Sequence, residues 1–226
     1  MAQPFSKDAG AKNNKKGYRF LLSLNDEQKE AKRQILDNTV SIILGKAGSG
    51  KTLLACQIAL QEVLQKRRKK IIITRPTISK EDLGHLPGNM EEKMSPWVAP
   101  IYGNMYQLLR RERVDKMIKD GQIEIVPVSY MRGRTFLDSC VIVDEAQNVT
   151  HDQMEMITTR LGLRSKMIIC GDDHQIDLKK KADSGFKYLY KASSKVKNLE
   201  AITLTSNHRN EIVEDLRDYY MDNPIY

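Results

Sequence analysis

The sequence predicts a doubly wound α/β fold, in which a mainly parallel β-sheet lies between two layers of helices. Two observations support this prediction. Six short apolar runs recur along the 226-residue chain with helical stretches between them, and a glycine-rich turn follows the first run. Short, fully apolar runs are typical of parallel strands that are buried on both faces. A chain of this length can form one such domain with a substantial core.

The elements are expected in the following order. Residues 39–44 form the first strand, and the glycine-rich turn leads from it into a helix at 50–66. The other strands are expected at 71–74, 122–128, 140–143, 166–170 and 201–204, with helical patterns at 89–119, 151–162, 183–191 and 209–220. The prolines and glycines between residues 77 and 99 predict loops and short helices. These could serve recognition, oligomer contact or a plain structural crossover.

The glycine-rich turn carries the strongest functional signal. Residues 45–52 read GKAGSGKT, a full match to the pattern G-x-x-x-x-G-K-[ST]. Between a strand and a helix, this pattern presents backbone N–H groups and a helix N-terminus to anionic oxygens, so it predicts a nucleoside triphosphate site. Lys51 can reach the β- and γ-phosphates, and the Thr52 hydroxyl can ligate Mg²⁺. The residues expected to contact the nucleotide are Gly45, Lys46, Ala47, Gly48, Ser49, Gly50, Lys51, Thr52 and Leu53.

Two later strands end in polar residues that suit the chemistry of such a site. The run at 140–143 leads into Asp144 and Glu145, at the sheet edge where ligands bind in open α/β folds. Asp144 can hold Mg²⁺ with its water shell, and Glu145 can polarise the attacking water as a general base. The run at 166–170 leads into GDDHQ, in which the Gln175 amide can sense the γ-phosphate. An ordinary acidic strand end and a plain β-turn are the alternatives.

The charge balance predicts an acidic partner. The formal net charge is +8, and nucleic acid is the most plausible polyanion. Five lysines or arginines and one aspartate lie in the first twenty residues. Residues 1–16 are therefore expected to form a flexible basic arm, which could hold RNA or DNA loosely or simply aid solubility. Residues 17–226 are expected to form the domain.

The remaining composition argues against several other classes. Cys56, Cys140 and Cys170 lie in apolar patterns without C-x-x-C spacing, so neither a disulfide framework nor a zinc site is expected. No stretch approaches the roughly 18 apolar residues of a membrane span, and the N-terminus lacks the apolar core of a secretory signal. A cytoplasmic location and no membrane partner are therefore expected.

Several motifs together resemble known families. In chain order, GKAGSGKT, IIITRP, VIVDEAQN, GDDHQ and LTSNHR resemble the first half of superfamily 1 helicases. The string LNDEQKEA at 24–31 is similar to the adenine-reading glutamine motif of those helicases, which implies that role for Gln28. Two longer strings, LGHLPGNMEEKMSPWVAPIY at 83–102 and VSYMRGRTFLDSCVIVDEAQN at 128–148, resemble the PhoH-like ATPase family. The resemblance covers roughly residues 22–218.

The resemblance implies a RecA-like P-loop core with three layers, αβα. It also implies that the protein binds and hydrolyses ATP with Mg²⁺, and that it is linked to RNA or single-stranded nucleic acid. Superfamily 1 helicases place a second RecA-like domain against the first to supply an arginine. Roughly fifty residues follow Gln175, too few for such a domain. Many PhoH-like chains also carry a PIN nuclease domain, for which this chain has no room. We therefore expect a stand-alone ATPase module, of the kind also encoded by bacteriophages.

The missing arginine is expected to come from a second copy of the chain. The candidates are Arg132, Arg134, Arg160 and Arg209. Arg209, placed like the γ-phosphate arginine of helicases, could instead act within its own subunit, and each candidate could simply form a surface ion pair. Head-to-tail contacts between copies form a ring when the rotation from one copy to the next closes a circle. By analogy with RecA-like modules, a homo-hexamer is expected.

A nucleic-acid surface is expected beside the strand that ends in Thr74-Arg75-Pro76. Tyr130, Met131, Arg132 and Arg134 follow a neighbouring strand, so that an aromatic ring could stack a base while guanidinium groups hold phosphates. Tyr130 could instead pack in the core.

Two other function classes stay open. One is a small-molecule kinase in which Asp144 activates a substrate hydroxyl, although no acceptor pocket or lid is recognisable. The other is a nucleotide-dependent module that regulates a nuclease or a ribosome-associated partner with little turnover.

Overall fold

The computed structural model describes residues 18–76, 90–208 and 211–223, and these contain a six-stranded sheet in the order β3-β2-β4-β5-β1-β6. Every pair of neighbouring strands is parallel. The strands are β1 (Val40–Gly45), β2 (Lys70–Thr74), β3 (Ile123–Ile125), β4 (Ser139–Val143), β5 (Lys166–Gly171) and β6 (Leu199–Leu204). All six predicted strands are confirmed. The predicted basic arm at 1–16, the segment 77–89 and Arg209 lie outside the described residues.

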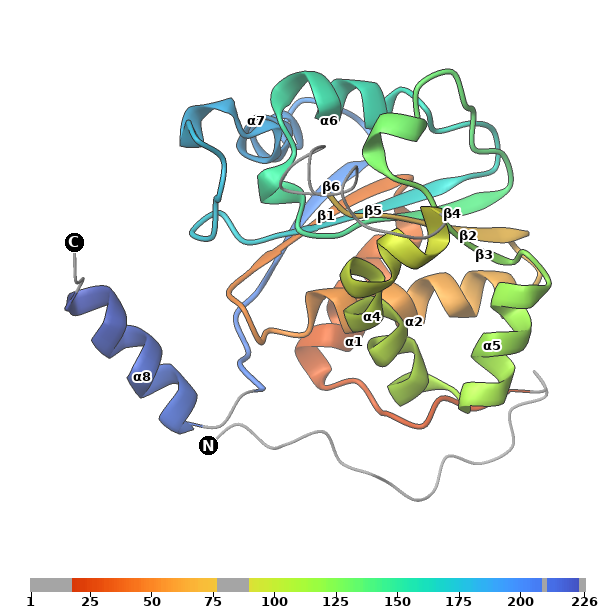
Figure 1. Ribbon diagram of the computed structural model, residues 1–226, viewed down its shortest axis with the longest axis horizontal. Coiled ribbons are helices and arrows are strands. Elements are labelled where there is room, and N and C mark those ends of the chain that lie inside the picture. The colour runs from red at the N-terminus through yellow and green to blue at the C-terminus, as the bar shows by residue number, and fades with distance from the viewer. Residues whose placement is uncertain (1–17, 77–89, 209–210, 224–226) are drawn as a thin grey trace.

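Helices cover both faces of this sheet, as Figure 1 shows. One face carries α1 (Asp26–Asp37), α2 (Lys51–Leu64), α4 (Met90–Leu108) and α5 (Arg111–Lys119). The other carries α6 (His151–Thr158) and α7 (Gly185–Ala192), while α8 (Glu211–Asp222) stands apart from the sheet. The predicted three-layer αβα architecture is therefore confirmed. No helix in the described ranges is long and apolar enough to cross a membrane.

The strands are apolar on both sides because each side packs against a helical layer. Ile43 of β1 belongs to the core that includes Leu54 of α2. The preceding residue, Ile42, points the other way and packs in a second core with Met154 of α6 and Phe186 of α7. This alternation explains why the sequence shows continuous apolar runs instead of a polar and apolar pattern.

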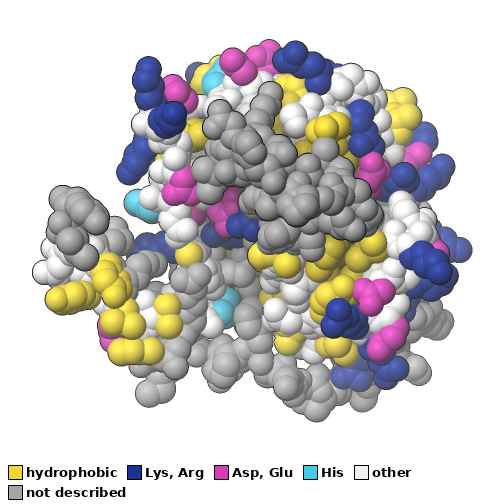
Figure 2. Space-filling view, in the orientation of Figure 1, with side chains coloured by type: hydrophobic (Ala, Val, Ile, Leu, Met, Phe, Trp, Pro, Cys, Tyr) yellow, Lys and Arg dark blue, Asp and Glu magenta, His cyan; other side chains and the backbone are white. Residues whose placement is uncertain are grey.

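Helix α8 has no such cover within the described residues. Its side chains Ile212, Leu216 and Tyr220 are each at least half exposed, and Figure 2 shows hydrophobic side chains gathered on this helix. Helix α8 follows β6 in the chain, and none of its described side chains belongs to the two cores beside the sheet.

Three details differ from the sequence prediction. The helix expected at 89–119 is two helices, because Arg110 adopts a non-helical conformation (ψ 138°) between α4 and α5. The strand expected at 122–128 spans only Ile123–Ile125, and Pro127, which lacks an N–H, precedes a short 3-10 helix at Val128–Tyr130. Helix α1 was not predicted, although its capping box, in which Asn25 and Gln28 exchange hydrogen bonds, is visible in the sequence.

A buried lysine joins α1 to the sheet. Lys166 of β5 is 3% exposed, and its ammonium donates hydrogen bonds to the carbonyl oxygens of Ile35 (2.6 Å), Leu36 (3.3 Å) and Asn38. These carbonyls lie at the C-terminal end of α1, where the helix leaves its last acceptors without partners and favours a positive charge. Burial lowers the pKa of Lys166.

We expect Lys166→Met to lower the free energy of unfolding by about 1–3 kcal/mol, because three carbonyl oxygens at the end of α1 would lose the ammonium donor while the side-chain volume is kept. Urea titration followed by circular dichroism measures this change. Lys29→Met on the exposed side of α1 is the control and should change stability by less than about 0.5 kcal/mol. Equal effects of the two substitutions would contradict the assigned role of Lys166.

Candidate nucleotide-binding site

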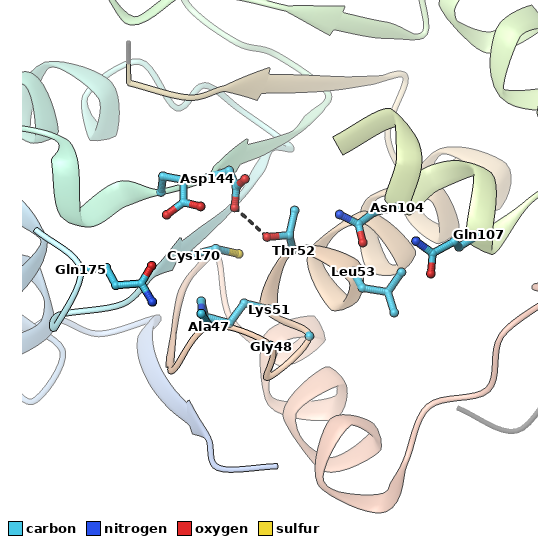
Figure 3. A pocket seen from close by; sticks show the side chains of 12 residues that line it. Ala47, Gly48, Lys51, Thr52, Leu53, Asn104, Gln107, Asp144, Cys170 and Gln175 are labelled. Atoms are coloured by element: carbon cyan, nitrogen blue, oxygen red, sulfur yellow. Dashed lines mark hydrogen bonds between the residues drawn. The ribbon is translucent and has the colours of Figure 1, made fainter. Parts of the chain in front are cut away.

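The loops that follow β1, β4 and β5 meet at the carboxyl edge of the sheet, where these three strands are neighbours. They enclose a pocket of about 390 Å³, lined by the glycine-rich loop together with Asp144, Glu145 and Gln175. Asn104 and Gln107 of α4 also line the pocket, and Figure 3 shows them on the opposite side of Lys51 from Gln175. Most of the residues predicted from separate motifs therefore line one pocket.

The glycine-rich loop has the backbone geometry that its sequence predicts. Gly50, the N-cap of α2, adopts the left-handed conformation (φ 83°), which glycine tolerates best. At Gly45 a Cβ atom would lie 2.6 Å from Ser49 Oγ and 2.7 Å from the Leu204 carbonyl oxygen. The loop therefore packs closely against the end of β6, and α2 begins at Lys51 with its N-terminus at the pocket.

Two side chains of this helix start face the pocket. The Lys51 ammonium lies over the loop and donates to the carbonyl oxygens of Gly45 (2.7 Å) and Lys46 (3.0 Å). The Thr52 hydroxyl donates to Asp144 Oδ1 at 2.8 Å, shown as a dashed line in Figure 3. The two motifs, which are 92 residues apart in sequence, are thus in direct contact.

Asp144 is buried at the end of β4, with 5% of its surface exposed. Burial, and next the nearby charge of Glu145, raise the pKa of Asp144, while the hydrogen bond from Thr52 opposes that shift. A hydroxyl and a carboxylate oxygen at hydrogen-bonding distance are hard ligands of the kind that Mg²⁺ prefers. The residues present therefore fit a magnesium site, as the sequence predicts.

Glu145 is held in a conformation that is unusual for its residue type. Its backbone is left-handed (φ 50°, ψ 40°), which for a non-glycine residue costs about 1–3 kcal/mol and is common at functional sites. Its Oε1 accepts a hydrogen bond from Arg75 Nη2 at 3.2 Å, and its Oε2 accepts one from Gln147 Nε2 at 2.8 Å. Both carboxylate oxygens are therefore occupied, although 39% of the side chain is exposed.

The GDDHQ segment places one carboxylate between the loop and Gln175. Asp172 is buried, and its Oδ2 accepts hydrogen bonds from the Ala47 N–H (3.0 Å) and from Gln175 Nε2 (2.9 Å). The backbone N–H of Asp172 donates to Gln147 Oε1 at 3.1 Å. Since Gln147 also donates to Glu145, Asp172 connects the phosphate loop, the predicted sensor and the predicted base. The sequence analysis missed this residue, although the GDDHQ motif contains it.

The segment after β6 fastens α1 to the phosphate loop. Glu27 accepts hydrogen bonds from the Thr205 N–H and hydroxyl (both 2.7 Å) and from the Ser206 N–H (3.0 Å). Burial alone would raise the pKa of Glu27, but these hydrogen bonds lower it to about 2. Two residues further on, the His208 N–H donates to the Gly48 carbonyl oxygen at 3.1 Å.

Gln28 lies directly beside the phosphate loop and is fully buried. Its Oε1 accepts from the Asn25 N–H at 3.2 Å, and its Nε2 lies 3.3 Å from His208 Nε2. A Cβ atom on Gly50 would lie 2.7 Å from the Gln28 amide nitrogen. Gln28 therefore packs against the glycine-rich loop at Gly50. Its implied contact with adenine stays a prediction.

None of the arginines predicted to act between copies lines the pocket among the described residues. Arg134 forms an ion pair with Glu124 Oε1 at 2.7 Å and lies over the Phe136 ring. Arg160 donates to the Met156 carbonyl oxygen within its own helical segment, whereas the Arg132 side chain is exposed.

The exposure of Tyr130 decides one of the sequence alternatives. Tyr130 is 55% exposed, so the proposed packing of this ring in the core is wrong. All three cysteines are buried and free. Burial raises the pKa of Cys140 to about 12 and that of Cys170 well above its usual value.

Cys170 lines the pocket, and so do Asn104 and Gln107, for which the sequence offered no motif.

The fold and this site define the class of RecA-like P-loop proteins. Two solved phage proteins share the fold. The large terminase of a thermophilic bacteriophage aligns over 90% of this chain and 51% of its own, with a TM-score of 0.55 and 13% identity. A mutant ATPase domain of the large terminase of a Thermus phage aligns over 90% and 89%, with a TM-score of 0.52 and 13% identity. At these identities the likeness is one of fold alone.

The chain belongs to the PhoH-like protein family, whose model matches residues 21–221. A PhoH-like protein of Bacillus subtilis is 41% identical over 187 residues, which is 82% of this chain and 58% of that protein. Protein PhoH of Escherichia coli is 39% identical over 168 residues, or 73% and 48%. This chain spans about half the length of the curated relatives it matches. The predicted family resemblance is confirmed.

We expect Asp172→Asn to weaken ATP binding about tenfold, because an amide has one acceptor oxygen where the carboxylate has two. It cannot accept both at the Oδ2 position, from Ala47 and Gln175, and at the Oδ1 position, from the His174 N–H. Titration with a fluorescent ATP analogue measures the dissociation constant, and circular dichroism checks that the fold is kept. Asp173→Asn, at the next position, is the matched control. Binding within twofold of the parent for both variants would contradict the connecting role of Asp172.

Proposed function

We propose that the chain binds ATP with Mg²⁺ in this pocket and hydrolyses it, in coupling to RNA or single-stranded DNA. The observation that carries the proposal is the 2.8 Å hydrogen bond between Thr52 and Asp144 at the start of α2, with Glu145 as the next residue. A helix N-terminus, a lysine, a hydroxyl and two carboxylates in one pocket suit a nucleoside triphosphate and its metal.

Each group has a distinct role in this proposal. Backbone N–H groups of the loop and the Lys51 ammonium hold the phosphates, and Thr52 and Asp144 hold Mg²⁺, which supplies charge neutralisation at the β- and γ-phosphates. Glu145 accepts the proton of the attacking water. Gln175, whose amide nitrogen is fixed by Asp172, is the group that reports the state of the γ-phosphate.

Nucleic-acid coupling is supported by charge and by exposed groups near the same sheet edge. The net charge is +8. Arg75 follows β2, and the exposed Tyr130 and Arg132 follow the neighbouring strand β3. An exposed aromatic ring with nearby guanidinium groups suits a single strand, through base stacking and phosphate contacts without sequence readout.

One observation favours a second candidate, a nucleotide-dependent binding module with little turnover. Both oxygens of Glu145 are occupied by Arg75 and Gln147, whereas a general base needs an oxygen within hydrogen-bonding reach of the attacking water. Phosphate release from ATP by the purified chain, with and without single-stranded RNA and DNA, separates the two candidates. ATP binding without release under every condition would favour the binding module.

Lys51→Ala is expected to lower ATP hydrolysis at least about 100-fold, because the ammonium would contact phosphate and its loss leaves the core intact. Steady-state phosphate release measures the effect, with thermal unfolding to confirm the fold. Lys116→Ala on the exposed side of α5 removes the same charge and should leave turnover unchanged. Turnover of Lys51→Ala within tenfold of the parent would be inconsistent with the assigned phosphate site.

Glu145→Gln is expected to keep ATP bound and to lower turnover at least about 100-fold, since the amide retains the shape of the side chain and loses its basicity. The two readouts are the ATP dissociation constant and single-turnover phosphate release. Glu155→Gln on α6 is the control for charge removal. If ATP affinity collapses while bound ATP still turns over normally, Glu145 is not the base.

We further propose that a neighbouring copy completes the site. Among the described residues, Lys51 is the one basic side chain that lines the pocket. An arginine at the γ-phosphate accelerates hydrolysis by about 10³–10⁵ in related reactions. Arg132 is the best placed of the predicted arginines, because it is exposed whereas Arg134 is paired with Glu124. A head-to-tail homo-hexamer is the favoured assembly.

Mixing two inactive variants tests this assembly. Arg132→Ala and Glu145→Gln chains should each be inactive alone and should regain activity together, because mixed rings contain sites with an intact base and a neighbour's intact arginine. Activity should also rise more steeply than linearly with protein concentration near the assembly threshold. A monomer by light scattering, with no restored activity on mixing, would contradict the ring and would favour Arg209 acting within its own subunit.

A further inference from the structure

Arg75 connects the two sites that the proposed function requires. It follows Thr74, whose carbonyl oxygen accepts a hydrogen bond from the Asp144 N–H at 2.9 Å. This bond fixes the ends of β2 and β4 side by side, since Thr74 and Val143 are partners in the sheet register. The residues that follow, Arg75 and Glu145, therefore meet, and their ion pair measures 3.2 Å.

The ion pair restrains the predicted base. Glu145 also accepts from Gln147, so both of its carboxylate oxygens are engaged and the side chain is held in one orientation. A carboxylate held in this way has no oxygen turned freely toward an attacking water, which is the contact that a general base must make. Release of Arg75 would leave Glu145 with a free oxygen beside the pocket.

The same arginine lies toward the predicted nucleic-acid surface. The Val126 N–H donates to the Ile73 carbonyl oxygen at 2.9 Å, so the chain that leaves β3 stays beside the end of β2. The exposed Tyr130 follows within that chain segment. The Arg75 side chain itself is 23% exposed and can be reached from solvent.

Carboxylate and phosphate are interchangeable partners for an arginine. The planar guanidinium presents a fork of N–H donors that fits either anion, and it stays charged at any physiological pH. A phosphodiester that reaches Arg75 can therefore replace the Glu145 carboxylate without leaving the guanidinium unpaired.

We propose that Arg75 is a positioning residue with two alternative anionic partners: it holds Glu145 in the free protein, and a phosphodiester of a bound single strand takes it away. The inference rests on the proposed function and gives its nucleic-acid coupling a physical mechanism. The ion pair and the bound strand compete for Arg75, so each weakens the other by the same free energy. Removing the charge of Glu145 should therefore strengthen single-strand binding.

The first test measures binding and needs no hydrolysis. Fluorescence anisotropy with a labelled oligo(U) and nucleotide-free protein should show several-fold tighter binding for Glu145→Gln than for the parent. Glu155→Gln, an exposed residue of α6, controls for the loss of one negative charge. In an Arg75→Ala background, which should itself bind oligo(U) more weakly, Glu145→Gln should have no further effect beyond that control.

The second test measures phosphate release. Arg75→Ala should raise the rate without RNA several-fold and lose most of the stimulation by oligo(U), whereas Arg75→Lys should retain part of both properties. A purely structural role predicts the opposite, namely a lower rate without RNA and an unchanged fold-stimulation.

The outcomes distinguish this inference from the proposed function. If the parent binds oligo(U) and hydrolyses ATP, but the Glu145→Gln and Arg75→Ala effects on binding are additive, the exchange of partners is wrong and the proposed function stands. If the parent binds no oligo(U) and RNA leaves its hydrolysis unchanged, both the nucleic-acid coupling and the role of Arg75 are overturned.

Discussion

The parallel register of β4, β5 and β1 is the constraint on which the whole candidate site depends. Val143 pairs with Ile169, and Ile43 pairs with Cys170, so the three strands end at the same edge of the sheet. Segments that are far apart in the sequence then begin their loops side by side. The hydrogen bond between Thr52 and Asp144 forms in this register. A shift of one residue would turn Asp144 toward the opposite face of the sheet.

Two buried carboxylates at the strand ends hold the candidate functional side chains in place by hydrogen bonds. Asp144 faces α2 through Thr52, whereas Asp172 holds the Ala47 N–H and the Gln175 amide. Buried carboxylates are costly unless they are hydrogen-bonded, so each acts as a fixed point around which the loops must order. The nucleotide pocket is therefore shaped by polar contacts at the strand ends, and the apolar cores on either side of the sheet keep those ends in place.

The sequence predicted the strands, the layers and most of the pocket, because these depend on local patterns. Apolar runs identify buried strands, and the eight residues at 45–52 form a motif whose geometry is nearly independent of context. The Arg75 contact with Glu145 could not be predicted, because it depends on which strands are neighbours. Asn104 and Gln107 were missed for a similar reason, since only the packing of α4 beside α2 brings them to the pocket. The short length of β3 follows from the restriction that Pro127 imposes on the backbone.

The ion pair between Arg75 and Glu145 joins the end of β2 to the pocket, and in our proposal it lets the pocket respond to a bound single strand. Glu145 lines the pocket, while Arg75 follows the end of β2, where the Val126 N–H of the segment that leads to Tyr130 donates to the Ile73 carbonyl oxygen. Phosphate release from Mg²⁺-ATP by the purified chain, measured with and without single-stranded RNA, tests this arrangement most directly. Hydrolysis that requires Mg²⁺ and rises when RNA is added is the expected result. Absence of phosphate release under both conditions, despite tight ATP binding, would contradict it.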